Sequence, residues 1–220
     1  MKVENKKLII FDMDGTILNT LLDLQASVNF ALKKHHFPTR DYEQIRRAVG
    51  NGVAMLVKRS LPNDVGDGKY KEVLKDFEDY YALHSEDKTV PYDGIISTLK
   101  ALKEKGYLLA VATNKIENVA KDLVNKIFPN LFITTCGDDG KRNKKPAPDC
   151  VFEIQKRLGV NDINEVVYIG DSEVDYMTAI NSKATPIVLT YGYRTLEELK
   201  PFIKDDTLIA NTPEEILKYL

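Results

Sequence analysis

The fold is decided by the stretch Leu8-Ile9-Ile10-Phe11-Asp12-Met13-Asp14-Gly15-Thr16. Four apolar residues that end abruptly at an acid predict a buried strand of a parallel sheet. In open α/β sheets, ligands bind beyond the carboxyl ends of the strands, which is where Asp12 and Asp14 lie. Residues two apart on a strand point to opposite faces. The chain therefore has to bend if both acids are to face one ligand, and Gly15 permits a bend.

Two carboxylates at a strand end can carry out chemistry together. One can be a nucleophile that forms an aspartyl-phosphate, and the other can act as a general acid and base. Both offer the hard oxygen ligands that Mg²⁺ prefers. The alternative is a strand end followed by an Asp-Gly turn with solvated acids. The rest of the chain has to decide between these two interpretations.

Length and composition place the chain among ordinary globular proteins. It has 220 residues, of which 43% are hydrophobic and 29% are charged. The net charge of −2 predicts no general attraction to nucleic acid or to a membrane surface. The polar start lacks a signal-peptide core, and no apolar run approaches the ~18 residues of a spanning helix. We expect a cytoplasmic protein, monomeric or homodimeric, with Cys136 and Cys150 as reduced thiols.

The pattern along the chain predicts an α/β protein: a parallel Rossmann-like sheet with helices on both faces and a helical cap inserted after the first strand. Residues 20–88 look all-helical, with Thr20 or Asp23 as the first helix cap. Strands then alternate with helices. We expect an α/β core domain at 1–18 and 89–220 and a helical cap domain at 19–88, which would act as a lid. The further strands are predicted at 107–112, 131–135, 166–169 and 186–189.

Three more polar stretches follow the ends of predicted strands. They are Ala112-Thr113-Asn114-Lys115, the basic run Lys141 to Asp149, and Ile169-Gly170-Asp171-Ser172-Glu173-Val174-Asp175. Each stretch has a structural alternative. The first could be a helix cap by Thr113 or Asn114, the second a solvated loop, and the third a pair of acids that complement a helix dipole. Together they place acids, a hydroxyl and a lysine at one edge of the sheet. That assembly suits a dianionic phosphate held by a metal ion, a lysine and backbone donors.

At this point the chain resembles the haloacid dehalogenase superfamily of phosphohydrolases. The resemblance covers nearly the whole chain. Its four motifs correspond to Asp12-Met13-Asp14-Gly15-Thr16, Thr113, Lys145-Pro146, and Gly170-Asp171-Ser172-Glu173-Val174-Asp175.

The resemblance implies a role for each motif residue. Asp12 would be the nucleophile and Asp14 the general acid and base. Thr113 would bind the transferring phosphoryl group, and Lys145 would pair with Asp12 and phosphate. The dehalogenase branch lacks the second acid of the first motif, so Asp14 favours phosphoryl transfer. The implied Mg²⁺ ligands are the Asp12 carboxylate, the Asp14 backbone carbonyl and Asp171, with Asp175 in support.

Within the superfamily the chain is most similar to the phosphoglycolate phosphatase branch. The resemblance therefore implies a Mg²⁺-dependent phosphatase acting on phosphoglycolate or a similar small phosphorylated metabolite. One departure is Asn19, where the branch usually has an acid. The similar stretches are Val49 to Val53, Tyr80 to His84, Thr89 to Ile95, Thr113 to Lys115 and Tyr191 to Arg194.

Substrate contacts are expected from two places. Asn114 and Lys115 follow the motif threonine. In the cap, Gly50-Asn51-Gly52 lies between two amphipathic helices beside Arg46. Glycines allow close backbone approach, and an arginine can clamp a carboxylate in a bidentate pair. We expect Arg46, Asn51 and Gly52 to recognise the acid group of the substrate. The alternative is a helix–helix turn with solvated basic side chains.

Four other functions remain open from the sequence. A phosphomutase acting on a sugar phosphate would use the same core, and so would a pyrophosphatase. A phosphonate-cleaving relative would need a Schiff-base lysine in the insertion, for which Lys58 is a candidate. The non-enzyme alternative is a phosphate-binding module, which the presence of all four motifs disfavours.

Overall fold

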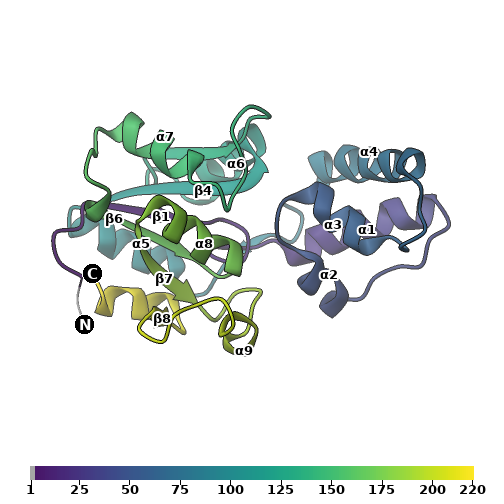
Figure 1. The fold of residues 1–220 in the computed structure, drawn as a ribbon. Coiled ribbons are helices and arrows are strands. Elements are labelled where there is room, and N and C mark those ends of the chain that lie inside the picture. Colours follow the sequence, from purple (N-terminus) through teal and green to yellow (C-terminus); the bar gives the residue numbers. More distant parts are fainter. Residues whose placement is uncertain (1–2) are drawn as a thin grey trace. The chain divides into compact units, whose positions relative to one another are not determined.

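The core of the chain is a six-stranded parallel sheet with strand order β5-β4-β1-β6-β7-β8 (Figure 1). The structure is a computed structural model and describes residues 3–220. β1 occupies the centre, where Phe11 pairs with Val111 of β4 and Ile169 of β6. The predicted parallel α/β sheet is confirmed. The strands are β1 (Leu8–Phe11), β4 (Leu108–Ile116), β5 (Thr134–Asp138), β6 (Val166–Gly170), β7 (Thr185–Leu189) and β8 (Leu208–Ala210).

Both faces of the sheet are buried. Successive residues of each central strand point to opposite faces, and an apolar cluster covers each face. Leu8 and Ile10 belong to one apolar cluster together with Tyr168, whereas Ile9 and Phe11 belong to the other. Every residue of β1 is fully buried. Such a strand has no polar face, which is why its sequence is a continuous apolar run.

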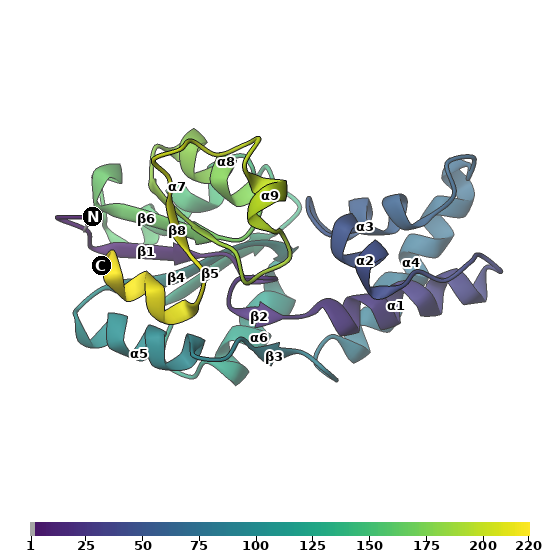
Figure 2. The same ribbon diagram turned by 90° about the horizontal axis from the view of Figure 1, so that it is seen from below.

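Helices cover the two faces in sets (Figure 2). α5 (Ile95–Glu104) and α6 (Glu117–Ile127) contribute to the cluster that holds Ile9 and Phe11, and so does the 3-10 helix η2 (Pro213–Lys218). α7 (Asp149–Leu158) and α8 (Glu173–Ser182) contribute to the other cluster. The short elements η1 (Ile163–Glu165) and α9 (Leu196–Leu199) lie in the connections to β6 and β8.

The chain divides into two compact units, Met1–Leu18 with Pro91–Leu220 and Asn19–Val90. The second unit is a helical bundle in which α1 packs on α2 and α4, and α3 packs on α2 and α4. Two short strands, β2 (Leu18–Asn19) and β3 (Val90–Pro91), pair where the chain passes between the units. The helices are α1 (Leu21–Lys34), α2 (Tyr42–Ala48), α3 (Val53–Ser60) and α4 (Asp67–His84).

Of the two residues predicted to cap α1, Thr20 is the N-cap residue, although its side chain makes no capping hydrogen bond. Asp23 does not cap the helix. Its buried carboxylate accepts hydrogen bonds from the backbone N–H groups of Lys88 and Thr89, at 2.8–3.0 Å, and from the Thr89 hydroxyl at 2.8 Å. The Asn19 side-chain oxygen accepts from the N–H of Leu21 instead. The acid usual at this position in the resembling branch could accept the same bond, so Asn19 preserves this local contact.

Two strand predictions were wrong in position. The strand expected at 131–135 lies at Thr134–Asp138, because Leu131 turns into the core beneath the sheet instead of pairing. The strand expected to end at 112 continues to Ile116, so neither Thr113 nor Asn114 caps a helix. β8 and η2 were not predicted.

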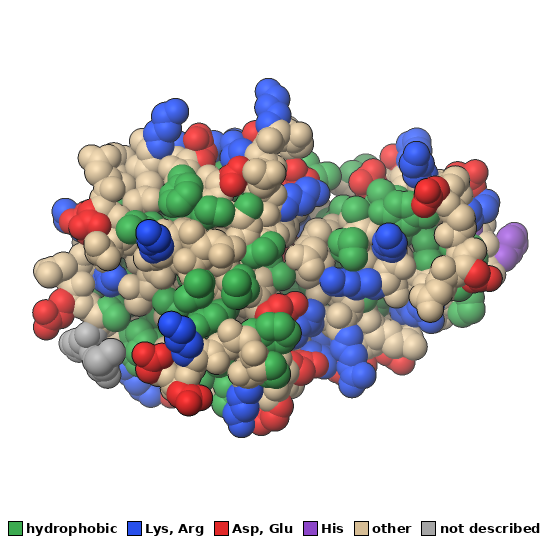
Figure 3. All heavy atoms as spheres, in the orientation of Figure 1, with side chains coloured by type: hydrophobic (Ala, Val, Ile, Leu, Met, Phe, Trp, Pro, Cys, Tyr) green, Lys and Arg blue, Asp and Glu red, His purple; other side chains and the backbone are tan. Residues whose placement is uncertain are grey.

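None of the helices in the described range 3–220 is long and apolar enough to cross a membrane. Lys and Arg side chains are interspersed with Asp and Glu side chains over the face drawn in Figure 3. This mixture agrees with a net charge close to zero.

Gly170, the last residue of β6, provides a test of how closely the strand approaches α8. A Cβ atom there would lie 2.3 Å from Cβ of Asp175, whereas a Cβ at Gly68 would meet nothing within 4 Å. We expect Gly170→Ala to destabilise the fold by about 1–3 kcal/mol through overpacking. Gly68→Ala, at an exposed position in the first turn of α4, should stabilise the fold by up to about 1 kcal/mol. Urea unfolding monitored by circular dichroism would measure both. Equal urea midpoints for the two variants would contradict the close packing of Gly170 against Asp175.

Candidate active site

A buried ion-pair cluster lies at the carboxyl end of β1. Asp12 follows β1 directly, Lys145 comes from the loop before α7, and Asp175 lies in the first turn of α8. The Lys145 ammonium is 2.7 Å from a carboxylate oxygen of Asp12 and 2.7 Å from one of Asp175. Its side chain is only 4% exposed. Lys144, the adjacent residue, points elsewhere and pairs with Asp138 at 2.7 Å.

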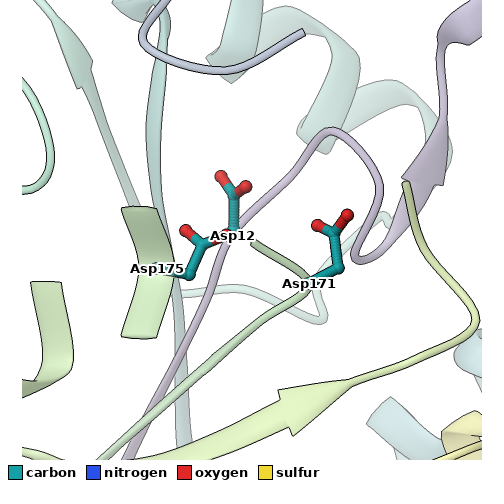
Figure 4. Close-up of side chains that lie close together, drawn as sticks. All are labelled: Asp12, Asp171 and Asp175. Carbon is teal, nitrogen blue, oxygen red and sulfur yellow. The ribbon is translucent and has the colours of Figure 1, made fainter. Parts of the chain in front are cut away.

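Asp171 joins this cluster, and the three acids gather around one point (Figure 4). Asp12, Asp171 and Asp175 each offer a carboxylate oxygen within 4.8 Å of the others. Hard oxygen donors at this spacing fit a Mg²⁺ ion, which relieves the repulsion among them. The chemistry of the donor set therefore suits the metal that the motifs imply.

The Asp171 carboxylate is fixed on both oxygens. The Thr16 hydroxyl donates to Oδ1 at 2.9 Å, and the backbone N–H of Tyr193 donates to Oδ2 at 2.7 Å. Gly15 has a φ of +87°, and a Cβ there would lie 2.4 Å from the Asp171 carboxylate. A Cβ atom at Gly192 would lie 2.4 Å from Cβ of Asp171. Only glycine fits such a backbone approach without strain.

Both carboxylate oxygens of Asp175 are hydrogen-bonded within the protein. Besides the Lys145 ammonium, Oδ1 lies 3.4 Å from the Tyr168 hydroxyl, which can donate to it. Oδ2 accepts from the Ser172 hydroxyl at 2.6 Å and from the Ser172 N–H at 3.2 Å. Ser172 thereby also caps α8 through a capping box with Asp175. These bonds suit Asp175 to a supporting position rather than to direct bonding of a ligand.

The end of β4 brings together the other core residues that the sequence singled out. Thr113 is buried, and its hydroxyl accepts from the N–H of Lys115 at 3.2 Å. The Asn114 side chain donates to the carbonyl of Lys145 at 3.1 Å and accepts from the N–H of Lys145 at 2.8 Å. The Lys115 ammonium lies 3.0 Å from Asp14. Asn114 and Lys115, expected to contact substrate, thus hold Lys145 and Asp14 in this structure.

Burial and mutual repulsion shift the ionisation of the cluster. Burial, followed by the charge of Asp175, raises the pKa of Asp12 well above the usual value, against the opposing effect of Lys145. Burial and Asp175 also raise the pKa of Asp171 to about 7. Burial alone would lower the pKa of Lys145, but Asp12 and Asp175 raise it well above the usual lysine value. A divalent cation would favour the ionised form of these acids.

The helical unit holds the remaining predicted residues, Arg46, Asn51 and Gly52. Arg46 pairs with Glu43 of the same helix at 2.9 Å. Asn51 and Gly52 have positive φ values of 62° and 85°, and Gly52 is the residue before α3. The guanidinium of Arg59 donates to the carbonyls of Ala48 and Gly50, at 3.0 and 3.2 Å, and so fixes this loop.

Sequence reasoning assigned no role to several residues that shape the site. Thr16 was quoted only as part of the first motif, and Tyr193 only as part of a similar stretch. Ser172 and Tyr168 were not singled out by function, and neither was Arg59. Their roles depend on contacts between segments far apart in sequence or on capping geometry. A small polar residue inside a strand-end motif is the signal that could have indicated Thr16.

Comparison with known proteins agrees with this geometry. The family model described as haloacid dehalogenase-like hydrolase matches residues 9–189. The chain belongs to the haloacid dehalogenase-like hydrolases. It is 33% identical over 216 residues to a phosphoglycolate phosphatase of Pseudomonas putida, covering 94% of this chain and 79% of that protein. It is 32% identical over 213 residues to one of Agrobacterium fabrum, covering 94% and 91%.

Solved structures with the same fold also match the chain. One is a crystal structure from Lactobacillus delbrueckii subsp. bulgaricus, described as a candidate phosphoglycolate phosphatase. It superposes with a TM-score of 0.89 at 34% identity and covers 98% of this chain and 97% of that chain. A predicted phosphatase from Clostridium acetobutylicum superposes with a TM-score of 0.84 at 24% identity, covering 97% of each chain, and shows the fold alone.

The raised pKa of Asp171 makes a prediction about stability. An aspartate that titrates near 7 when folded and near ~3.9 when unfolded holds a proton in the native state between these values. Stability in metal-free buffer should therefore fall as the pH rises from about 4 to about 7 and stay low above it. Asp171→Asn removes this charge. We expect the variant to melt about 5 °C higher than the parent at pH 8, with the difference shrinking toward pH 5.

Melting curves by scanning fluorimetry, with a metal chelator present, would measure the difference. Asp122→Asn is the control because Asp122 is exposed on α6, outside the cluster. If Asp171→Asn melts below the parent at pH 8, the Asp171 carboxylate is not an uncompensated buried charge, and the prediction is contradicted.

Proposed function

We propose that this hydrolase is a Mg²⁺-dependent phosphatase that acts on a small phosphorylated acid through an aspartyl-phosphate intermediate on Asp12. The observation that carries the proposal is the buried contact between Lys145 and Asp12, beside Asp171 and Asp175. A carboxylate next to a fixed ammonium and two further acids suits a nucleophile that works on a dianion in the presence of a cation.

The chain's own residues can supply the steps of the reaction. An oxygen of Asp12 attacks phosphorus while the bond between phosphorus and the leaving alkoxide breaks. Asp14 gives the oxygen of the leaving alkoxide a proton. Asp14 then takes a proton from water, which attacks the same phosphorus and releases Asp12. Lys115, 3.0 Å from Asp14, holds that carboxylate in place. Lys145 balances charge on Asp12 and on the phosphoryl oxygens.

Mg²⁺ would be held by Asp12, Asp171 and the backbone carbonyl of Asp14, with Asp175 in support. When bound, it neutralises negative charge and lowers the repulsion between phosphate and the nucleophile. Thr113, at the end of β4, would bind the phosphoryl oxygens through its hydroxyl.

Phosphoglycolate is the substrate we expect first. The relatives from Pseudomonas putida and Agrobacterium fabrum that the chain matches over most of its length are phosphoglycolate phosphatases. This substrate carries a carboxylate as well as a phosphate. We propose that the helical unit acts as a cap whose Gly50-Asn51-Gly52 loop, held by Arg59, recognises that carboxylate together with Arg46.

The function is tested by measuring phosphate release from a panel of phosphate monoesters, with and without Mg²⁺. We expect Mg²⁺-dependent turnover, fastest on phosphoglycolate. Asp12→Asn should abolish it while the circular dichroism spectrum stays unchanged, because the variant loses the nucleophile but keeps its size. Turnover of this variant within tenfold of the parent would remove Asp12 from the role. A product other than free phosphate, such as an isomeric sugar phosphate, would instead indicate a mutase.

The two adjacent lysines provide a matched pair. Lys145→Ala should lower kcat by at least about 100-fold, since a charge partner of the nucleophile and phosphate is lost. Lys144→Ala should stay within about twofold because its partner is Asp138. Asn114→Ala should fall in between, since the Lys145 backbone loses two hydrogen bonds while its ammonium keeps its acids. If Lys144→Ala and Lys145→Ala behave alike in steady-state assays, Lys145 has been misassigned.

Substrate selection by the loop of the helical unit can be measured separately. Arg46→Ala and Asn51→Ala would be assayed on phosphoglycolate and on p-nitrophenyl phosphate, which lacks a carboxylate. At least one should lose kcat/KM for the acid selectively, by about tenfold or more, as expected for a lost charged hydrogen bond. Lys75→Ala is the control, because Lys75 pairs with Asp79 on the surface of the same unit. Equal losses on both substrates would exclude this loop as the specificity element.

A further inference from the structure

Two thiols lie side by side on the sheet face opposite Phe11. Cys136 is in the middle of β5 and Cys150 in the first turn of α7. Their Sγ atoms are 2.7 Å apart, and both cysteines are free. They are the only two cysteines of the chain. Between β5 and α7 the chain forms the loop 139–148, which carries Lys145.

The two sulfurs differ in environment. Cys136 is fully buried, whereas Cys150 is 6% exposed. The Cys136 thiol donates a hydrogen bond to the Cys150 sulfur. That bond, together with the nearby charges of Arg142 and Lys145, lowers the pKa of Cys150, while the same contact and burial raise the pKa of Cys136. Cys150, at a helix N-terminus, is thus the more nucleophilic and more accessible sulfur.

We propose that Cys136 and Cys150 form a peroxide-reactive pair that closes to a disulfide around the Lys145 loop. The Cys150 thiolate attacks one oxygen of hydrogen peroxide, the O–O bond breaks, and hydroxide leaves, which gives a sulfenic acid on Cys150. The Cys136 sulfur then attacks Cys150 Sγ, and the sulfenic oxygen leaves as water after taking the proton of the Cys136 thiol. The net reaction converts two thiols and one peroxide into one disulfide and two waters.

The geometry predicts what the disulfide does to the protein. A disulfide bond is about 2.05 Å long, so the sulfurs have to approach by well under ~1 Å. β5 and α7 can keep their positions, and Lys145 can keep its contacts with Asp12 and Asp175. The disulfide therefore preserves the site and protects Cys150 from further oxidation. The oxidation itself is independent of the proposed phosphatase function, on which only the effect on turnover rests.

Intact-mass spectrometry of the full chain, treated with hydrogen peroxide and then denatured and alkylated, tests the pair. The parent should lose the mass of two hydrogen atoms, bind no alkylating agent, and regain both thiols with a reductant. Its melting temperature should rise by about 5 °C or more, as expected for a cross-link closing a loop of about 15 residues. Phosphate release should stay within about twofold of the reduced protein.

Single-cysteine variants separate a pair from two independent thiols. Cys136→Ser, whose hydroxyl can still donate to the Cys150 sulfur, should leave Cys150 to gain two or more oxygen atoms, which reductant cannot remove, at peroxide doses that leave the parent as a reversible disulfide. Cys150→Ala should resist the same doses. The proposal is overturned if the parent gains oxygen at Cys150 without forming the disulfide. It is equally overturned if both thiols of the folded parent stay unmodified at doses that oxidise them in urea.

Discussion

The structure depends on the ammonium group of Lys145, which lies between the carboxylates of Asp12 and Asp175 at 2.7 Å from each. A buried charge is tolerated only when it is paired and hydrogen-bonded, and removing one partner of such a pair typically costs about 3–5 kcal/mol. The contact joins the end of β1, the loop before α7 and the start of α8. Asn114 holds the backbone of the same lysine, so β4 is tied to this point as well.

One lysine does not balance three acids, and this imbalance links the fold to the chemistry. Asp171 remains close to Asp12 and Asp175 without a basic partner of its own among the described contacts; its oxygens accept from Thr16 and Tyr193. The carboxylates can approach this closely because Gly15 and Gly192 leave no side chain in the way. The site is therefore suited to bind a cation and a dianion together, and its three carboxylates repel one another when no cation is bound.

The sequence could predict those parts of the site that depend on local pattern. An apolar run that ends at Asp12 identifies a strand end, and the Lys145-Pro146 motif of the resemblance selects Lys145 rather than Lys144. The sequence could not predict that Asn114 binds the backbone of Lys145 or that Lys115 contacts Asp14, since these contacts join segments about 30 and 100 residues apart. The position predicted for β5 was wrong for the same reason, whereas β6 and β7 lie where they were predicted. The Leu131 region is apolar enough for a strand, but the register that β4 imposes selects Thr134–Asp138.

The central claim is that Asp12 carries the phosphoryl group, and trapping the acyl phosphate tests it most directly. The variant Asp14→Asn would be mixed with Mg²⁺ and acetyl phosphate, whose good leaving group needs no acid, so that the intermediate forms but hydrolyses slowly. Quenching with borohydride converts an aspartyl-phosphate to homoserine, which peptide mass spectrometry locates. The account predicts homoserine at position 12, and only when the phosphate donor is present. Donor-dependent homoserine at another aspartate, with Asp12 unchanged, would contradict it.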